Sequence, residues 1–199
     1  MSDEFDRHAQ RKAATHQKIL DATQDLIAQR GYVQVDISDI TECANVSRGT
    51  FYQHFANKEA CVRELVQQGF ESLLQEILEN RHETESVEIW GRDSLTRVFT
   101  WTRENQELLQ VILGGAASPE LNIFGRSYMA DIIEQNLHHA ENWAESQLPI
   151  TIRAQVITGT LIQLLNWWLE TDNDYSAEQM AHMIHLVFTS GLAPDIPQS

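Results

Sequence analysis

Residues 36–55, which read DISDITECANVSRGTFYQHF, constrain the fold of this 199-residue chain more than any other stretch. Asp36 is a good N-cap, and apolar residues follow it at helical spacing, so we expect a helix from Ile37 to Cys43. A second short helix is expected to begin only a few residues later. Two short helices around a tight turn are typical of the helix-turn-helix motif, which reads DNA.

The residues between the two helices suit a tight turn. Asn45 tolerates a left-handed backbone better than any residue except glycine, and Val46 supplies an apolar side chain that can pack beneath the turn. Ser47 can cap the next helix, which is therefore predicted to begin at Arg48.

The second helix has an apolar side and a polar side. At about 100° per residue, Phe51 and Phe55 lie on one side, whereas Gly49, Thr50 and Gln53 lie on the other. A polar side of this kind can enter a major groove, but any small helical core can contain two short helices and a turn. The pattern alone therefore leaves DNA binding and a purely structural role open.

Side chains around this helix suit different parts of a DNA duplex. Arg48 is suited to guanine, Gly49 lets the backbone come close, and Thr50 suits a base edge or a thymine methyl group. Three further side chains are expected to reach phosphates, namely Tyr52, His54 and Lys58. The predicted DNA-binding residues are Arg48, Gly49, Thr50, Tyr52, Gln53, His54 and Lys58.

Six short motifs in this region carry a family resemblance. They are Gly31-Tyr32, Asp39-Ile40, Ala44-Asn45-Val46-Ser47, Gly49-Thr50-Phe51-Tyr52, His54-Phe55 and Lys58-Glu59-Ala60. In this order and at this spacing they resemble the DNA-binding domain of the tetracycline-repressor (TetR) family. The resemblance covers about Thr15 to Leu65. It implies a ligand-responsive regulator, usually a repressor, whose DNA-facing positions fall on Arg48, Gly49, Thr50, Tyr52, His54 and Lys58.

Two residues depart from the family pattern. Asp36 stands where similar proteins often carry a hydroxyl residue, and its carboxylate caps a helix well but would repel a nearby phosphate. One backbone contact per subunit is therefore in doubt. Asn45 replaces the more usual glycine, which a positive φ permits at small cost.

The acidity of the chain is unevenly distributed. The net charge is −15, from 14 Lys and Arg against 29 Asp and Glu. Residues 1–62 hold seven basic and nine acidic residues, a balance of −2, and the remainder holds seven and twenty, a balance of −13. An acidic second domain weakens non-specific DNA binding, so local cations must act at the interface.

The composition favours a cytoplasmic protein. The sequence contains no apolar run of 18 residues and no signal-peptide pattern, so neither a membrane span nor export is expected. The two cysteines, Cys43 and Cys61, do not suggest a disulfide framework. We expect Cys61 to be buried and Cys43 to lie nearer the surface. A redox switch between them has little support, because neither has an evident basic activator in sequence.

Helical periodicity continues along the whole chain, so an all-α fold of about nine helices is predicted. An arm with Arg7, Arg11 and Lys12 is expected either to follow a DNA groove or to be an ordinary disordered terminus.

The expected domains are a helix-turn-helix domain over 1–57 and an effector-binding and dimerisation domain over 58–199. Outside the motif, helices are expected at Ala14 to Gln29, Asn57 to Arg81, Asp93 to Trp101, Glu104 to Leu113, Pro119 to Asn142, Ile150 to Glu170 and Ala177 to Ser190.

Residues 156–169, VITGTLIQLLNWWL, form a helix that is apolar almost all round. Such a helix must be buried almost all round, and this one is too short to span a bilayer. Burial against a second subunit predicts a homodimer, and the TetR resemblance likewise implies an intersubunit four-helix bundle with the last helix. The predicted interface residues are Val156, Gly159, Thr160, Gln163, Leu164, Trp168, Met180, Ile184, Val187 and Phe188.

Aromatic residues are concentrated in the second domain, where all five tryptophans follow Ser86. Aromatic residues at helical spacing are more often core than pocket, but the group suggests a site for a lipophilic effector, and the acidic surroundings would also suit a cationic one. The predicted effector-binding residues are Trp90, Phe99, Trp101, Leu109, Leu113, Phe124, Tyr128, Gln163 and Trp167, with Ile112, Trp143, Asn166 and Trp168 as further candidates.

Metal binding and catalysis have little support. The pairs His138-His139 and His182 with His185 lack a nearby third ligand, so neither a metal nor a cofactor is expected. A Gly-rich phosphate loop and a nucleophile elbow are both missing from the sequence, so no enzyme is indicated.

Two functions remain open: a ligand-responsive regulator that binds a palindromic operator as a dimer, and a dimeric ligand-sequestering or protein-interaction module with weak DNA binding.

Overall fold

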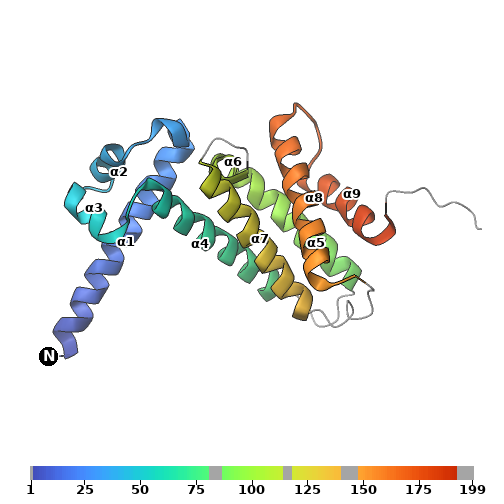
Figure 1. Cartoon of the computed structure of the whole chain (residues 1–199), viewed down its shortest axis with the longest axis horizontal. Coiled ribbons are helices and arrows are strands. Elements are labelled where there is room, and N and C mark those ends of the chain that lie inside the picture. Colours follow the sequence, from blue (N-terminus) through green and yellow to red (C-terminus); the bar gives the residue numbers. More distant parts are fainter. Residues whose placement is uncertain (1, 81–86, 114–117, 140–147, 192–199) are drawn as a thin grey trace, which may run out of the picture. The chain divides into compact units, whose positions relative to one another are not determined.

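The computed structural model describes residues 2–80, 87–113, 118–139 and 148–191, and this part of the chain is helical throughout (Figure 1). It contains nine α-helices and one 3₁₀ turn, η1. The predicted all-α fold is therefore confirmed. The elements are α1 (Ser2–Arg30), η1 (Tyr32–Gln34), α2 (Ile37–Cys43), α3 (Arg48–His54), α4 (Lys58–Glu79), α5 (Val87–Glu104), α6 (Gln106–Leu113), α7 (Pro119–His139), α8 (Ile150–Glu170) and α9 (Ala177–Ser190).

The chain divides into two compact units. The first consists of Met1–Gly69 and Glu107–Gln163, and the second of Phe70–Gln106 and Leu164–Ser199. The helices α4 and α8 each contribute residues to both units. Among the described helices, none is long and apolar enough to cross a membrane.

The helix-turn-helix forms with the predicted boundaries. Asp36 begins α2 with a capping box, in which its carboxylate accepts hydrogen bonds from the Ser38 and Asp39 backbone N–H groups. Asn45 has a φ of 51°, so the predicted left-handed turn residue is confirmed. Ser47 then caps α3, because its Oγ accepts a hydrogen bond of 3.0 Å from the Thr50 N–H.

These short helices are held by an apolar core. Ile19 and Leu20 of α1, Ile40 of α2 and Phe51 of α3 are fully buried. Cys61 of α4 is also fully buried, and burial raises the pKa of its thiol to about 11. An inert, buried Cys61 and an exposed Cys43 agree with the expected positions of the two residues.

The first helix is longer than predicted. It begins at Ser2 rather than near Ala14, so Arg7, Arg11 and Lys12 lie on a helix and not on an extended arm. Residues 2–13 contain no glycine or proline, and acidic residues in the first turn stabilise a helix N-terminus. The prediction was wrong because residues 7–14 are exposed and therefore carry no apolar periodicity.

The second unit is built around an aromatic contact. Phe99 of α5 is fully buried and meets Trp168 of α8 edge-to-face, with ring centroids 5.3 Å apart. The Arg103 guanidinium lies 4.2 Å from the centre of the Trp168 ring, and the indole N–H donates a hydrogen bond to the Tyr175 carbonyl. The helix α9 packs on α5 in the same unit. The helices α8 and α9 have the predicted bounds, and α5 is longer at both ends than expected.

Candidate nucleic-acid interface

The helix α3 presents a polar face and buries an apolar one. Phe51 and Phe55 are buried, whereas Arg48, Gly49, Tyr52 and Gln53 are exposed, and Thr50 and His54 are half-buried. The two-sided character predicted from helical spacing is therefore present in the structure. The exposed face carries a guanidinium, a phenol and an amide, which are groups that bind phosphates and base edges.

Two residues at the start of α3 have geometry that bears on DNA reading. The Thr50 hydroxyl lies 2.8 Å from Ser47 Oγ, so it is held toward the N-cap and leaves the Thr50 methyl group for an apolar contact. A Cβ placed on Gly49 would meet only Ser47 Oγ, at 3.6 Å. The fold itself therefore does not require glycine at position 49.

Lys58 is engaged within the protein. Its ammonium donates hydrogen bonds to the carbonyl oxygens of Tyr32 and Val35, at 2.8 and 2.6 Å, and lies 3.9 Å from the centre of the Tyr32 ring. Burial lowers the pKa of Lys58 below its ordinary value. Two of the three ammonium donors are thus used within the protein. A phosphate would have to share the ammonium with both carbonyls, so we leave Lys58 out of the contact set proposed below.

Asp36 is likewise occupied by capping. Its Oδ1 accepts hydrogen bonds of 2.6 Å from the Ser38 N–H and 3.0 Å from the Asp39 N–H, and these bonds lower the pKa of its carboxyl group. The side chain nevertheless remains exposed at the N-terminus of α2. Its negative charge is thus present on the surface near α3, as the sequence suggested.

The structure also reveals a polar cluster that sequence reasoning missed. His16 Nε2 lies 2.5 Å from Glu64 Oε1, and His16 Nδ1 lies 3.3 Å from His54 Nδ1. These three residues come from α1, α4 and α3 of the first unit. They are 38 and 48 positions apart in the chain, so no local pattern could have joined them.

Comparison with known proteins agrees with this geometry. The family model described as bacterial regulatory proteins of the tetR family matches residues 19–65, and a transcriptional regulator C-terminal region matches residues 92–190. The chain belongs to the TetR family. It is a DNA-binding transcriptional regulator and not an enzyme.

Similar proteins in the TetR family include regulators of fatty acid metabolism. The fatty acid metabolism regulator protein of Bacillus subtilis is 22% identical, and the match covers 91% of this chain and 97% of that protein. The structure of the fatty acid degradation regulator FadR of Bacillus halodurans is 23% identical with a TM-score of 0.71, covering 89% of this chain and 96% of that one. The FadR repressor of Thermus thermophilus, in complex with lauroyl-CoA, is 16% identical with a TM-score of 0.72, covering 92% and 98%.

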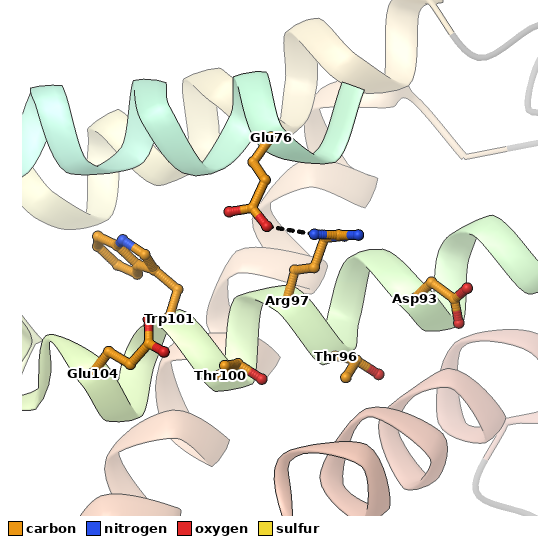
Figure 2. A pocket seen from close by; sticks show the side chains of 7 residues that line it. All are labelled: Glu76, Asp93, Thr96, Arg97, Thr100, Trp101 and Glu104. Atoms are coloured by element: carbon orange, nitrogen blue, oxygen red, sulfur yellow. Dashed lines mark hydrogen bonds and ion pairs between the residues drawn. The ribbon is translucent and has the colours of Figure 1, made fainter. Parts of the chain in front are cut away.

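The second unit contains a pocket of about 380 Å³. Figure 2 shows Glu76 of α4 and Arg97 of α5 pointing toward each other across it, joined by an ion pair. Three carboxylates and one guanidinium line this pocket, so it has an acidic character. The lining residues are Glu76, Asp93, Thr96, Arg97, Thr100, Trp101 and Glu104.

Of the predicted effector residues whose side chains the structure describes, only Trp101 lines this pocket. In the second unit, Phe99 and Trp168 are core residues, whereas Trp167 is 40% exposed. In the first unit, Leu109, Ile112 and Leu113 are buried, Phe124 stacks on Tyr128 with centroids 5.6 Å apart, and Gln163 is exposed. The side chain of Trp90 and all of Trp143 lie outside the described residues. The effector role of the predicted set remains a prediction.

The helix α8 has exposed residues at helical spacing along one face, where this TetR regulator was predicted to dimerise. They include Ile152, Val156, Gly159, Gln163 and Trp167, and Ile152 and Val156 are 49% and 58% exposed. A Cβ on Gly159 would meet nothing within 4 Å, so this position is open to a partner helix.

The other predicted interface residues have varied exposure. Trp168, Met180 and Ile184 are buried within the chain itself, and the remaining four are half-buried: Thr160, Leu164, Val187 and Phe188. We therefore leave the three buried residues out of the interface proposed below. Among the residues that the structure describes, no group of three His, Cys, Asp or Glu side chains could hold a metal ion.

Proposed function

We propose that this TetR-family regulator binds a palindromic operator as a homodimer, acts as a repressor and is released by a small lipophilic effector. The observation that carries the proposal is the geometry of α3. Ser47 caps the helix, Phe51 anchors it in the core, and Arg48, Tyr52 and Gln53 are exposed on its outer face. An anchored helix with exposed polar side chains can lie in a major groove.

The proposed contacts divide between bases and phosphates. We assign the exposed Arg48 to guanine, and the Thr50 methyl group can contact a thymine methyl because the hydroxyl is held by Ser47. The exposed Tyr52 and half-buried His54 are assigned to phosphates. Close approach of the backbone at Gly49 would bring these groups to the duplex.

A dimer is supported by the exposed apolar side chains of α8. A soluble chain does not usually leave several large apolar side chains exposed in a row, and Ile152, Val156 and Trp167 are all at least 40% exposed. A second copy of α8, related by a two-fold axis, would cover them, and Gly159 would allow close approach. Two α3 helices related by that axis would read a palindrome.

Repression and a lipophilic effector are supported by the similar proteins. The relatives named above regulate fatty acid metabolism or degradation, and one is a repressor in complex with lauroyl-CoA. A long-chain acyl compound is therefore the first effector class to test. The carboxylates of the pocket in the second unit outnumber its single guanidinium, so we expect the phosphates of a CoA moiety to lie outside this pocket. It would suit an uncharged or cationic group better.

The test measures the linkage between operator and effector. Fluorescence anisotropy of DNA from upstream of the chain's own gene gives operator affinity, with lauroyl-CoA as the effector probe and free CoA as the matched control. We expect lauroyl-CoA to weaken operator binding roughly 5–150-fold, which corresponds to a typical coupling of about 1–3 kcal/mol. Tryptophan fluorescence then reports effector affinity with and without DNA, and reciprocity requires the same factor. Equal effector affinities in the two titrations would contradict release by that compound.

The alternative, a dimeric ligand-sequestering or protein-interaction module with weak DNA binding, has two observations in its favour. The exposed Asp36 and the net charge of −15 both oppose approach of a polyanion. If the protein bound no duplex with sequence preference but bound an effector tightly, this alternative would be favoured.

A further inference from the structure

Three titratable side chains meet at the C-terminal end of α3, the helix proposed to contact DNA bases. His54 ends α3, His16 comes from α1, and Glu64 comes from α4. The His16 ring lies between the other two: its Nε2 is 2.5 Å from Glu64 Oε1, and its Nδ1 is 3.3 Å from His54 Nδ1. It also stacks on the Phe55 ring, with centroids 4.5 Å apart and an angle of 26° between the planes. His16 is thus fixed in both orientation and partners.

The hydrogen bonds that link Glu64, His16 and His54 determine which ring nitrogens donate and which accept. A carboxylate can only accept, so His16 Nε2 carries the proton that is donated to Glu64. A neutral His16 then has an unprotonated Nδ1, which accepts a hydrogen bond. The facing Nδ1 of His54 must therefore carry a proton and donate it. In neutral His54 this leaves Nε2 without a proton, so Nε2 is an acceptor.

A DNA phosphate is also an acceptor, so it cannot bond to an unprotonated Nε2. We propose that His16 and Glu64 are positioning residues that hold His54 in the tautomer whose Nε2 can donate to a DNA phosphate only after taking up a proton. The proposal rests on the proposed phosphate contact of His54. Operator binding would then be accompanied by uptake of one proton per protomer, which forms the His54 imidazolium between the phosphate and the His16–Glu64 pair.

The charges around His54 determine the direction of the pH dependence. The groups that face it are Lys12 and His16 from α1 and, through His16, Glu64 from α4. In the free protein, burial, followed by neighbouring positive charge such as that of Lys12, lowers the pKa of His54 below its ordinary value. A bound phosphate favours the cation and raises that pKa. The added affinity is therefore fully present below the free-state pKa and is lost as the pH rises through the DNA-bound pKa.

The experiment measures operator affinity against pH at constant ionic strength. The probe is a duplex that the protein itself enriches from a random-sequence pool, and anisotropy is read from about pH 5.5 to 8.5, the range in which histidine titrates. For the wild type we expect the affinity of a dimer for its operator to fall by up to about 100-fold per pH unit over part of this range, as uptake of one proton by each of the two protomers requires. His54→Asn should remove this dependence. His138→Asn, a change at an exposed histidine of α7, should retain it.

Glu64→Gln distinguishes positioning from a merely structural role. Loss of the carboxylate makes the His54 cation less stable, so the pH dependence should move to lower pH, whereas a structural defect would weaken binding equally at every pH. Imidazole NMR of the free protein gives a second readout that needs no DNA. There, Glu64→Gln should lower the pKa of His54, and the wild type should show His54 protonated at Nδ1.

Three results would overturn the inference. If operator affinity did not change with pH, no proton would be taken up on binding. That result is expected if His16 is the cation and His54 already carries its proton on Nε2. A His54 titration that Glu64→Gln leaves unmoved would remove the positioning role. Loss of sequence-preferring binding at every pH would instead remove the proposed function itself, and with it the contact on which this inference depends.

Discussion

The ammonium nitrogen of Lys58 lies 2.6 Å from the carbonyl oxygen of Val35, the residue immediately before the α2 cap. A second hydrogen bond joins the same ammonium to the Tyr32 carbonyl, and the charge lies over the Tyr32 ring. The first residue of α4 therefore holds the segment that leads into the helix-turn-helix. This relationship gives Lys58 a structural role that its position in the sequence did not suggest.

Lys58→Met removes the ammonium but keeps most of the aliphatic stem. We expect the free energy of unfolding to fall by about 2 kcal/mol, because the carbonyls of the half-buried Tyr32 and the buried Val35 lose a charged donor. Thermal or urea denaturation followed by circular dichroism measures this loss. The exposed Lys18 offers the matched control, Lys18→Met, which should leave stability nearly unchanged. A stable Lys58→Met variant whose salt dependence of DNA binding falls by about one unit would instead indicate a phosphate contact.

Arg48→Ala tests base reading. Because Arg48 is exposed at the start of α3, we expect its loss to cost about 1–3 kcal/mol at the preferred site and to relax the preference at one base position. Anisotropy with a set of single-base variants of the preferred duplex measures both effects. The control Arg126→Ala removes the same charge from an exposed position on α7. Equal losses in the two variants would mean that Arg48 acts only through charge.

Gly49→Ala separates the needs of the fold from those of DNA. The fold has room for a Cβ at this position, and alanine favours a helix over glycine by up to about 1 kcal/mol, so stability should stay the same or rise. Operator binding should nevertheless weaken if the α3 backbone approaches the duplex closely. Denaturation and anisotropy on the same preparation give both values. A variant that binds the operator as tightly as the wild type would place Gly49 away from DNA.

Asp36→Thr tests the departure from the family pattern. Threonine retains a capping oxygen but removes a negative charge from the N-terminus of α2. If the carboxylate repels a nearby phosphate, the variant should bind the operator more tightly, and most clearly at low salt. Asp25→Thr, at an exposed position of α1, controls for the change in net charge. Equal gains in both variants would show only a general effect of charge.

Local signals were sufficient to predict the reading motif. The caps of α2 and α3 depend on side chains that bond to a backbone N–H two or three residues away, so Asp36 and Ser47 identify them directly. The left-handed turn depends on Asn45 alone. The wrongly placed start of α1 had the opposite cause, because an exposed helix carries no apolar periodicity.

The tertiary contacts of the candidate sites could not be predicted in this way. The bond between His16 and His54 joins residues 38 positions apart, and Lys58 contacts carbonyls more than 20 positions away. Aromatic composition indicated where a pocket should be sought, but Phe99 and Trp168 pack against each other in the core. A pocket depends on where packing fails to fill space, and one-dimensional spacing does not contain that information.

The exposed face of α8 allows a matched pair of variants. Val156→Asp places a charge on the proposed dimer face, whereas Ile123→Asp makes a similar change at a 65% exposed position on α7. The first should lower both dimer formation and operator affinity, and the second should leave both intact. These two proteins serve as the controls for the following experiment.

The most direct measurement enriches duplexes from a random-sequence pool with the purified protein and then determines how many protomers bind each selected duplex. We expect a palindrome whose half-site centres are separated by about one helical turn, 34–36 Å, or slightly more, with two protomers bound. Val156→Asp should fail to enrich this palindrome, and Ile123→Asp should enrich it as the wild type does. Selection of asymmetric sites bound by one protomer, or no sequence selection by the wild-type protein, would contradict dimeric operator reading.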